Sequence, residues 1–217
     1  NRTKIKKLMI KPMLAHKYDK KRINWSKPVY IQPKLDGVRC LIKLEPDNII
    51  KAYSRTGKEF KNINHILKNL QPFFKMQPHI VLDGELYNHD LKNDFEKIIS
   101  LVRKTKPTDE HRAEAAQMVQ FHCYDYFSTC DCTKTGSYKD RMHALNVADF
   151  YDECIKHVPA SLIDSYNYAR TIHEKFLKDG YEGSIIRLDG LYKHGRSYDL
   201  MKFKDFSDAE ATIVGYE

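Results

Sequence analysis

Apolar and polar residues alternate along residues 38–44, and this period of two is typical of a β-strand with one buried face. The alternation places Arg39 on the face opposite to Val38, Cys40, Ile42 and Leu44. Residues 45–48 form a turn signal, and residues 49–53 can form a return strand. The pattern therefore predicts a hairpin that ends at the polar segment 54–57.

The rest of the chain shows a mixture of helical and strand periodicities. Apolar residues at helical spacing predict helices over 62–75, 91–104, 110–117, 138–156 and 165–179, the last ended by Gly180. Short apolar or alternating runs predict strands over 29–32, 80–82, 119–127, 183–188, 198–204 and 210–216. Because hairpins recur among the helices, the pattern favours an α+β domain with mainly antiparallel sheets over a doubly wound parallel sheet.

The composition limits the class of protein. Hydrophobic residues make up 41% of the 217 residues and aromatic residues 12%, which allows a sizeable core and excludes a disordered chain. Apolar runs are only a few residues long, so no transmembrane helix is expected. The net charge of +8 favours polyanionic partners such as nucleic acid or nucleotide phosphates. The five cysteines have no repeated spacing, which is typical of an intracellular protein with reduced thiols.

The segment from Lys34 to Arg39 reads Lys-Leu-Asp-Gly-Val-Arg, and it is the strongest candidate for chemistry. A lysine can attack a phosphoryl centre only as the neutral amine, so it needs cationic or desolvating neighbours. Lys202 and Lys204 could supply them, because they share one face of a predicted strand. The motif favours a phosphate-handling enzyme with Lys34 as its nucleophile.

Four more motifs place a charged residue at a strand end or beside a glycine, where the backbone can approach a ligand closely. They are Ser54-Arg55-Thr56-Gly57, Asp83-Gly84-Glu85, Glu182-Gly183-Ser184-Ile185-Ile186-Arg187 and Met201-Lys202-Phe203-Lys204. Glu85 and Glu182 are candidate ligands of a divalent cation or of ribose hydroxyls. The candidate phosphate or ribose clamps are Arg39, Arg55, Arg187 and Arg196. Each motif alone has a commoner interpretation, since Asp-Gly is usually a turn and Lys-x-Lys a solvated strand face.

In this order and spacing, the five motifs resemble those of the covalent nucleotidyltransferases, and most of all the small viral and phage ATP-dependent DNA ligases. The resemblance begins at Lys11-Pro12-Met13-Leu14-Ala15 and runs through Tyr192-Lys193-His194-Gly195-Arg196-Ser197 to residue 214. It implies an α+β nucleotidyltransferase (adenylation) domain with mainly antiparallel sheets, flanking helices and an ATP cleft between the sheets. We expect this domain to span residues 1–207. Residues 208–217 are expected to begin an OB domain, or its connecting strand, of which the rest is missing from the chain.

The resemblance also implies a role for each candidate residue. Lys34 would attack the α-phosphate of ATP and carry AMP as a lysyl-adenylate, with pyrophosphate as the leaving group. Gln32 would read the edge of the adenine, and Tyr124 and Ile185 would cover its two faces. The remaining nucleotide contacts would come from Arg39, Arg55 and Glu85 at the ribose, Lys202 and Lys204 at the α-phosphate, and Glu182 and Glu85 at the metal ion. Contacts with phosphates of the nucleotide or of nucleic acid would come from Arg39, Arg187 and Arg196.

The implied activity is the sealing of nicked duplex DNA, with ATP and Mg²⁺ as cofactors. AMP would pass from Lys34 to the 5′-phosphate of the nick, and the adjacent 3′-hydroxyl would then displace it. We expect a monomer with no membrane partner that works in the cytoplasm, or in the host cytoplasm if its source is a virus or phage. Arg187 stands where many members carry lysine, and Tyr124 where many carry phenylalanine. Without an OB domain, the chain is expected to adenylate poorly.

Several alternatives remain open from the sequence. The lysine motif and Asp83-Gly84-Glu85 do not separate DNA ligases from RNA ligases or from mRNA capping guanylyltransferases, although residues 208–215 favour a DNA ligase. An NAD-dependent ligase is disfavoured because only 33 residues precede Lys34. A catalytically silent nucleic-acid-binding domain would explain the net charge, but not the intact lysine motif with both glutamates.

Overall fold

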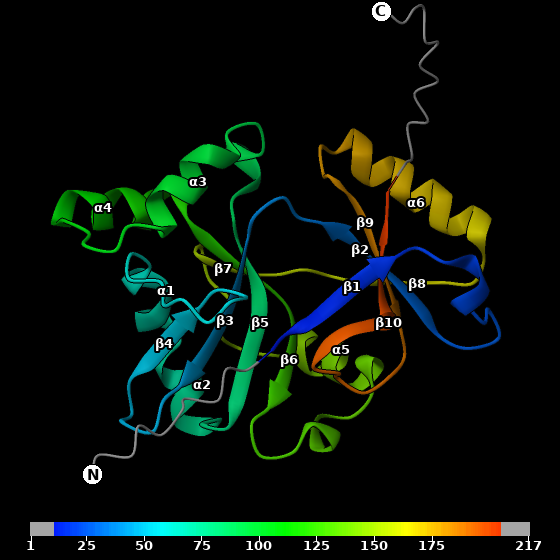
Figure 1. The fold of residues 1–217 in the computed structure, drawn as a ribbon, viewed down its shortest axis with the longest axis horizontal. Coiled ribbons are helices and arrows are strands. Elements are labelled where there is room, and N and C mark those ends of the chain that lie inside the picture. The colour runs from blue at the N-terminus through cyan, green and yellow to red at the C-terminus, as the bar shows by residue number, and fades with distance from the viewer. Residues whose placement is uncertain (1–10, 205–217) are drawn as a thin grey trace, which may run out of the picture.

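The computed structural model describes residues 11–204, which form two five-stranded β-sheets with helices packed against them (Figure 1). Sheet A has the strand order β1-β10-β9-β2-β8 and sheet B the order β4-β3-β5-β6-β7. The strands of sheet A are β1 (Met13–Lys17), β2 (Val29–Lys34), β8 (Ser161–Ile163), β9 (Gly183–Leu188) and β10 (Gly195–Phe203). The strands of sheet B are β3 (Val38–Leu44), β4 (Ile50–Tyr53), β5 (Ile80–Tyr87), β6 (Gln120–Ser128) and β7 (Ile155–His157). Two strand pairs, β1 with β10 and β6 with β7, are parallel, and the other pairs are antiparallel.

Six α-helices and three short 3₁₀ turns connect these strands within the described part of the chain. The helices are α1 (Asn64–Asn69), α2 (Gln71–Met76), α3 (Phe95–Val102), α4 (Asp109–Met118), α5 (Tyr138–Asn146) and α6 (Tyr166–Lys178). The 3₁₀ turns are η1 (Lys20–Arg22), η2 (His89–Leu91) and η3 (Cys132–Thr135). Within residues 11–204, none of the helices has both the length and the apolar character needed to cross a membrane.

One face of sheet A is covered by α6, which lies beside β9 at the right of Figure 1. The helix begins after Ser165, whose hydroxyl accepts a hydrogen bond from the N–H of Tyr168 at 3.3 Å. Its apolar residues recur at helical spacing, so they form one stripe toward the sheet. This stripe packs against Val29, Ile31, Ile186, Met201 and Phe203. Because side chains alternate along a strand, the opposite face of β2, β9 and β10 carries Gln32, Lys34, Ile185, Arg187 and Lys202.

One face of sheet B is covered by α1 to α4, at the left of Figure 1. Apolar side chains of these helices share a core with Cys40, Ile42, Leu82, Leu86 and Phe121 of the sheet. The alternation along the strands then sends Arg39 and Leu41 of β3, and Asp83 and Glu85 of β5, to the other face. A smaller cluster of Met13, Leu41, Val81, Phe127, Tyr192 and Leu200 contains residues from both sheets. The polar faces of the two sheets are thereby held toward each other.

The predicted fold class is confirmed, and so are most of the predicted elements. The hairpin of β3 and β4 and the strands β6 and β9 lie within a few residues of their predicted bounds. The strand predicted over 80–82 continues through Asp83 and Gly84 to Tyr87, and the strand predicted from residue 198 already begins at Gly195. The helix predicted over 91–104 begins only at Phe95, after η2.

The single helix predicted over 62–75 is wrong, because the structure has two helices separated at Leu70. Pro72 is the physical reason. It has no N–H to donate, and in a continuous helix its ring would clash with the carbonyl group of Lys68. At the second position of a new helix the missing N–H does no harm, and Pro72 takes that place in α2.

The helix predicted over 138–156 is wrong in its second half. The helix α5 ends at Asn146, and the chain returns to sheet B as β7, parallel to β6. Asp152 fixes this return, because its Oδ1 accepts hydrogen bonds from the N–H groups of Cys154 and Ile155, both at 2.7 Å. The strands β1, β7 and β8 have three to five residues each and were not predicted. The strand predicted over 210–216 and the boundary at 207/208 lie outside the described residues.

Candidate active site

A cavity of about 210 Å³ lies between the polar faces of the two sheets. Ten of the twelve predicted site residues line it. They are Gln32, Lys34, Arg39, Arg55, Glu85, Tyr124, Ile185, Arg187, Arg196 and Lys202. The other two, Glu182 and Lys204, are joined to the cavity through Lys34. The structure therefore brings the five sequence motifs together in one place.

Strand register places Lys34 beside Glu182. Lys34 is the last residue of β2 and pairs with Gly183, and the N–H of Glu182 donates to the carbonyl oxygen of Lys34 at 3.2 Å. The carboxylate of Glu182 accepts from both neighbouring lysines, with Oε2 on Lys34 Nζ and Oε1 on Lys204 Nζ. Burial opposes the charge of Glu182, but hydrogen bonds from Lys204 and Lys34 outweigh it, so the pKa of Glu182 lies below its usual value. Glu182 thus holds the ends of β2 and β10 together through two ammonium groups.

Lys202 lies in a row across sheet A with Ile185 of β9 and Gln32 of β2. Burial lowers the pKa of Lys202, and the positive charges of Lys34 and Lys204 lower it further. Lys34 and Lys204 share the carboxylate of Glu182, and their positive charges disfavour that of Lys202. Such a concentration of positive charge is a site for a polyanion.

Arg39 is fixed by a bidentate ion pair with Asp83. Its Nε and Nη2 lie 2.6 Å from the two carboxylate oxygens of Asp83, and Nη2 also donates to the carbonyl oxygen of Met13 at 3.1 Å. Tyr192 donates to the same carboxylate at 2.6 Å. Burial opposes the charge of Arg39, but Asp83 and Tyr124 favour it, so the pKa of Arg39 is raised well above its ordinary value. Asp83 lies inside β5, so its motif is not a turn.

Two glycines of the motifs are required by close packing of the strands. A Cβ atom on Gly37 would lie 2.5 Å from Cγ of Glu85 and 2.6 Å from the carbonyl oxygen of Leu86. A Cβ atom on Gly84 would lie 2.4 Å from the carbonyl oxygen of His122. These distances are too short for any side chain, so glycine lets β3, β5 and β6 approach each other beside the cavity.

Glu85 and Tyr124 form a polar pair on the sheet B side of the cavity. Tyr124 donates its hydroxyl proton to Oε2 of Glu85 at 3.2 Å. Burial raises the pKa of Glu85 to about 7, although Arg39, Tyr124 and Lys34 all favour its ionised form. The guanidinium carbon atoms of Arg39 and Arg187 lie 5.1 and 5.4 Å from the centre of the Tyr124 ring. The ring is an apolar surface within a charged wall, which suits stacking against a planar ligand.

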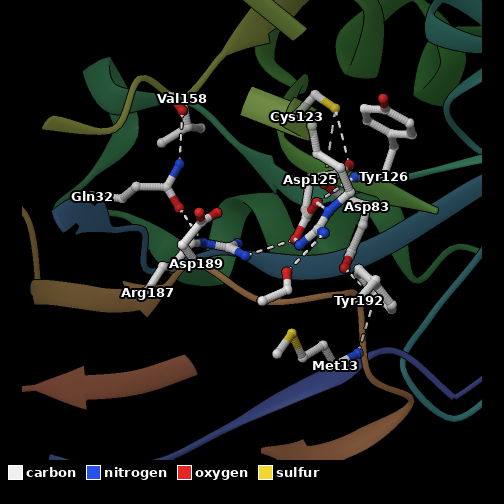
Figure 2. A network of polar contacts seen from close by, with 12 residues as sticks. Met13, Gln32, Asp83, Cys123, Asp125, Tyr126, Val158, Arg187, Asp189 and Tyr192 are labelled. Carbon is white, nitrogen blue, oxygen red and sulfur yellow. Dashed lines mark hydrogen bonds and ion pairs between the residues drawn. The ribbon is translucent and has the colours of Figure 1, made fainter. Parts of the chain in front are cut away.

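Arg187 belongs to a buried network that sequence reasoning did not foresee (Figure 2). Its Nη1 donates to Asp125 at 2.7 Å, and its Nε donates to Oε1 of Gln32 at 2.6 Å. Nε2 of Gln32 donates to the carbonyl oxygen of Val158 at 2.8 Å. Arg141 donates to the second oxygen of Asp125 at 2.7 Å. The predicted phosphate clamp Arg187 therefore has two nitrogen atoms on partners within the protein.

Arg55 and Arg196 are the exposed arginines of the site. Arg55 follows β4 and reaches the cavity from sheet B, whereas Arg196 lies on β10 of sheet A. Nη1 of Arg196 donates to the carbonyl oxygen of Ala15 at 2.8 Å. Their exposure leaves both side chains accessible to an anionic ligand that enters from solvent.

A preformed metal cage is absent from the described residues, where no group of three or more His, Cys, Asp and Glu side chains is placed to hold an ion. The predicted metal ligands Glu85 and Glu182 supply hard carboxylate oxygens at the cavity. This donor set fits Mg²⁺, which proteins commonly bind through one or two carboxylates together with the phosphates of a substrate.

The partners of the predicted residues are what the sequence did not reveal. Asp83 and Asp125 stand in the same motifs as Glu85 and Tyr124, so their acidity was a usable signal. Arg141 comes from α5, and no local pattern points to it. Tyr192 comes from the loop before β10, in a segment that carries the family resemblance but without a role of its own there. Together these residues orient side chains that line the cavity.

Comparison with known proteins identifies the family of the chain and agrees with its fold. Residues 12–204 match the family model of the ATP dependent DNA ligase domain. The DNA ligase of Enterobacteria phage T4 is 25% identical over 94% of this chain and 50% of its own length. The DNA ligase of African swine fever virus (isolate Tick/South Africa/Pretoriuskop Pr4/1996) is 30% identical over 86% of this chain and 44% of its own length. The chain thus spans about half the length of these relatives.

Solved structures agree in fold. A Lig E DNA ligase, studied for DNA binding with a minimal scaffold, has a TM-score of 0.70 and 23% identity over 97% of this chain and 76% of its own. The ATP-dependent DNA ligase from bacteriophage T7, in complex with ATP, has a TM-score of 0.70 and 16% identity over 89% of this chain and 68% of its own. From the family match over residues 12–204, the chain belongs to the ATP-dependent DNA ligase domain family.

Proposed function

We propose that this chain is the adenylating part of a DNA ligase that takes AMP from ATP onto Lys34 and delivers it to nicked DNA. The observation that carries the proposal is the position of Lys34, whose amine faces the cavity and is held by Glu182 beside two further lysines. A nucleophile fixed at the end of a strand in a cationic cavity suits phosphoryl transfer, where positioning and charge neutralisation dominate.

The first step joins Lys34 to AMP. The ammonium group gives up a proton to water, and the neutral Nζ then attacks the α-phosphorus of ATP. A P–N bond forms, and the bond from the α-phosphorus to the bridging oxygen breaks, so that pyrophosphate leaves with the bonding electrons. Lys202 and Lys204 would support this step, because their positive charges lie near Lys34 and could neutralise the charge that develops on the phosphates. Mg²⁺, bound to the nucleotide phosphates with Glu85 or Glu182 as protein ligands, would supply further charge neutralisation.

The walls of the cavity suit the rest of the nucleotide. Tyr124 and Ile185 offer apolar surface for the adenine, and Gln32, which pairs with Ile185, offers its amide to the edge of the base. Glu85 and Arg55 also line the cavity and would bind the ribose hydroxyls, and Arg39 lies against the Tyr124 ring. Arg196 is exposed at the rim, where it can reach a phosphate of ATP or of the nick.

The later steps use the same residues on DNA. The 5′-phosphate of a nick attacks the lysyl-adenylate, the P–N bond breaks, and AMP moves to the DNA. The 3′-hydroxyl then attacks the activated 5′-phosphate and releases AMP. The net charge of +8 supports a polyanionic partner, and we propose nicked duplex DNA as that partner.

Covalent labelling tests the proposal. The chain is incubated with Mg²⁺ and either [α-³²P]ATP or [α-³²P]GTP, and the products are separated on a denaturing gel. We expect a label from ATP that is acid-labile and alkali-stable, as a phosphoramidate is. Lys34→Ala should abolish the label, whereas Lys51→Ala, a remote strand lysine, should retain it. Circular dichroism of Lys34→Ala should match that of the parent chain.

The possible results separate the alternatives. A label from GTP in place of ATP would indicate a capping guanylyltransferase. Label that persists in Lys34→Ala would show that Lys34 is not the nucleophile. If neither nucleotide labels the chain, sealing of a pre-adenylated nick tests whether the later steps are present, and failure in both assays would contradict the proposal.

A further inference from the structure

The amide of Gln32 is held between two groups of opposite hydrogen-bonding character. Its Oε1 accepts from Nε of Arg187 at 2.6 Å, and its Nε2 donates to the carbonyl oxygen of Val158 at 2.8 Å. Figure 2 shows the side chain between these two partners. Gln32 is 2% exposed and Arg187 is 4% exposed, so bulk water has little access to compete for these hydrogen bonds.

These partners permit only one orientation of the amide. An arginine side chain can donate but never accept, and a backbone carbonyl can accept but never donate. A flipped amide would therefore place two donors against each other at Arg187 and two acceptors against each other at Val158. Both contacts are buried, so the flip would leave unsatisfied polar groups at each end.

Arg187 is itself held firmly in place. Asp125 accepts from Nη1 of Arg187 and is shared with Arg141, and Asp125 and Arg141 are each 1% exposed. The guanidinium of Arg187 also lies over the ring of Tyr138, with Cζ 4.6 Å from the ring centre. The planar fork of arginine allows one edge to bond Asp125 while Nε bonds Gln32.

A fixed amide leaves one N–H and one oxygen lone pair for a ligand in the cavity that Gln32 lines. Adenine presents a donor at its N6 amine next to an acceptor at N1, which suits an acceptor and a donor in that order. Guanine presents an acceptor at O6 next to a donor at N1–H, which is the reverse order. A base fixed in one pose therefore fits Gln32 as adenine and meets like groups as guanine.

We propose that Arg187 is a specificity-determining residue that locks the Gln32 amide in the orientation that accepts adenine and rejects guanine. This proposal rests on the proposed function, because it takes the cavity to be a nucleotide site. It gives Arg187 a role in selecting the base in place of the predicted contact with phosphate. Arg187 is a positioning residue, because it acts on the base through Gln32.

The test compares binding of ATP and of GTP by calorimetry, for the parent chain, Arg187→Met and Arg141→Met. Arg141→Met is the matched control, because it removes another buried arginine from Asp125 and leaves the contact between Arg187 and Gln32 intact. In both variants Asp125 keeps one arginine, so neither leaves it as an unpaired buried charge.

We expect the parent chain to prefer ATP, and Arg187→Met to lower the ratio of ATP to GTP affinity by about tenfold. Arg141→Met should change both affinities by a similar factor and leave the ratio near that of the parent. Arg187→Lys keeps the buried charge beside Asp125 and serves as the variant that retains the fold, and it should shift the ratio in the same direction by less. Thermal unfolding of each variant confirms that the compared chains are folded.

An unchanged ratio of ATP to GTP affinity in both Arg187 variants would overturn the proposal that Arg187 orients Gln32, while leaving the proposed function intact. A ratio that falls equally in Arg141→Met would show a general loosening of the site and would also overturn it. If the parent chain binds neither nucleotide, the proposed function and the proposed role of Arg187 both fail. The ratio is informative because a purely structural defect weakens both nucleotides together.

Discussion

Glu182 is the residue at which the charges of the cavity are balanced. Its two carboxylate oxygens each accept from a lysine, so Glu182 partly neutralises Lys34 and Lys204. A triphosphate that enters the cavity offers the same lysines a competing anion. Lys204, with its side chain 43% exposed, can turn toward the phosphates more easily than Lys34, which is 16% exposed. Lys34 would thus stay in place while Lys204 turns toward the phosphates.

Glu85 predicts a pH dependence of stability. Burial raises the pKa of Glu85 to about 7 in the folded chain, above its usual value of 4.5. Between these values the folded state holds a proton that the unfolded state has lost, so stability falls as the pH rises from 5 to 8. Between pH 5 and pH 8, we expect the unfolding free energy of Glu85→Gln to fall by about 1–2 kcal/mol less than that of the parent chain, because a neutral amide does not titrate. Urea unfolding at both pH values measures it.

The control for this prediction is Glu59→Gln, which changes an exposed glutamate outside the cavity. It should follow the pH dependence of the parent chain. Equal losses of stability in Glu85→Gln and in the parent chain would show that Glu85 is already ionised at pH 5.

Residues with a chemical role could be predicted from the sequence better than the residues that orient them. Lys34, Glu85 and Glu182 each stand in a short motif whose charge and glycine indicate a ligand site. Arg141 could not be found in this way, because its role depends on a hydrogen bond to Asp125 that forms only in the folded chain. Gln32 was assigned to the base, but the sequence could not show that both ends of its amide already have partners.

At the scale of elements, the approach of β3 to β5 predicts the effect of a single methyl group. Gly37→Ala would place Cβ 2.6 Å from the backbone oxygen of Leu86, which cannot move without shifting β5. We expect a loss of about 1–3 kcal/mol in the free energy of unfolding. Because Lys34 and Arg39 flank this glycine, labelling by ATP should fall as well. Urea unfolding and the labelling assay measure the two effects.

Asp36→Ala is the matched change for Gly37→Ala, because Asp36 is the exposed neighbour in the same turn. Its free energy of unfolding should stay within about 0.5 kcal/mol of the parent. If Gly37→Ala is as stable as the parent chain, β3 and β5 can move apart without a loss of unfolding free energy, and close packing at Gly37 is not required.

Local patterns predicted the hairpin of β3 and β4 and the apolar strand β2, but missed the short strands β1, β7 and β8. The hairpin of β3 and β4 is closed by a short turn, so its alternation and its turn residues both act locally. The strand β1 pairs in parallel with β10, at the far end of the described chain. Its five residues, Met-Leu-Ala-His-Lys, carry no periodic signal that is strong enough to identify a strand.

At the scale of the molecule, the site exists only because the two sheets face each other. Sheet A supplies Lys34, Lys202 and Gln32, whereas sheet B supplies Glu85 and Tyr124. The two sheets are joined by a small apolar cluster and by ion pairs such as Arg187 with Asp125. A nucleotide that contacts both sheets would add to these links, so binding and the relative position of the sheets are coupled.

With DNA as the proposed partner, the net charge of +8 predicts how binding should depend on salt. Affinity for any duplex should fall steeply with salt, because neutralised phosphates release counterions. A nick should gain additional affinity from its 5′-phosphate, since the cavity holds exposed cations such as Arg55 and Arg196. We expect a nick with a 5′-phosphate to bind about tenfold tighter than a nick with a 5′-hydroxyl.

Fluorescence anisotropy over a range of salt concentrations separates these two contributions. Intact duplex and the 5′-hydroxyl nick serve as controls of equal length, and they differ from the substrate only at the site where AMP would be accepted. Arg196→Ala should reduce the preference for the 5′-phosphate and leave binding to intact duplex nearly unchanged, because Arg196 lies at the rim of the cavity. Equal affinities for the three duplexes at every salt concentration would indicate a general nucleic-acid binder whose charge, and not its cavity, selects the partner.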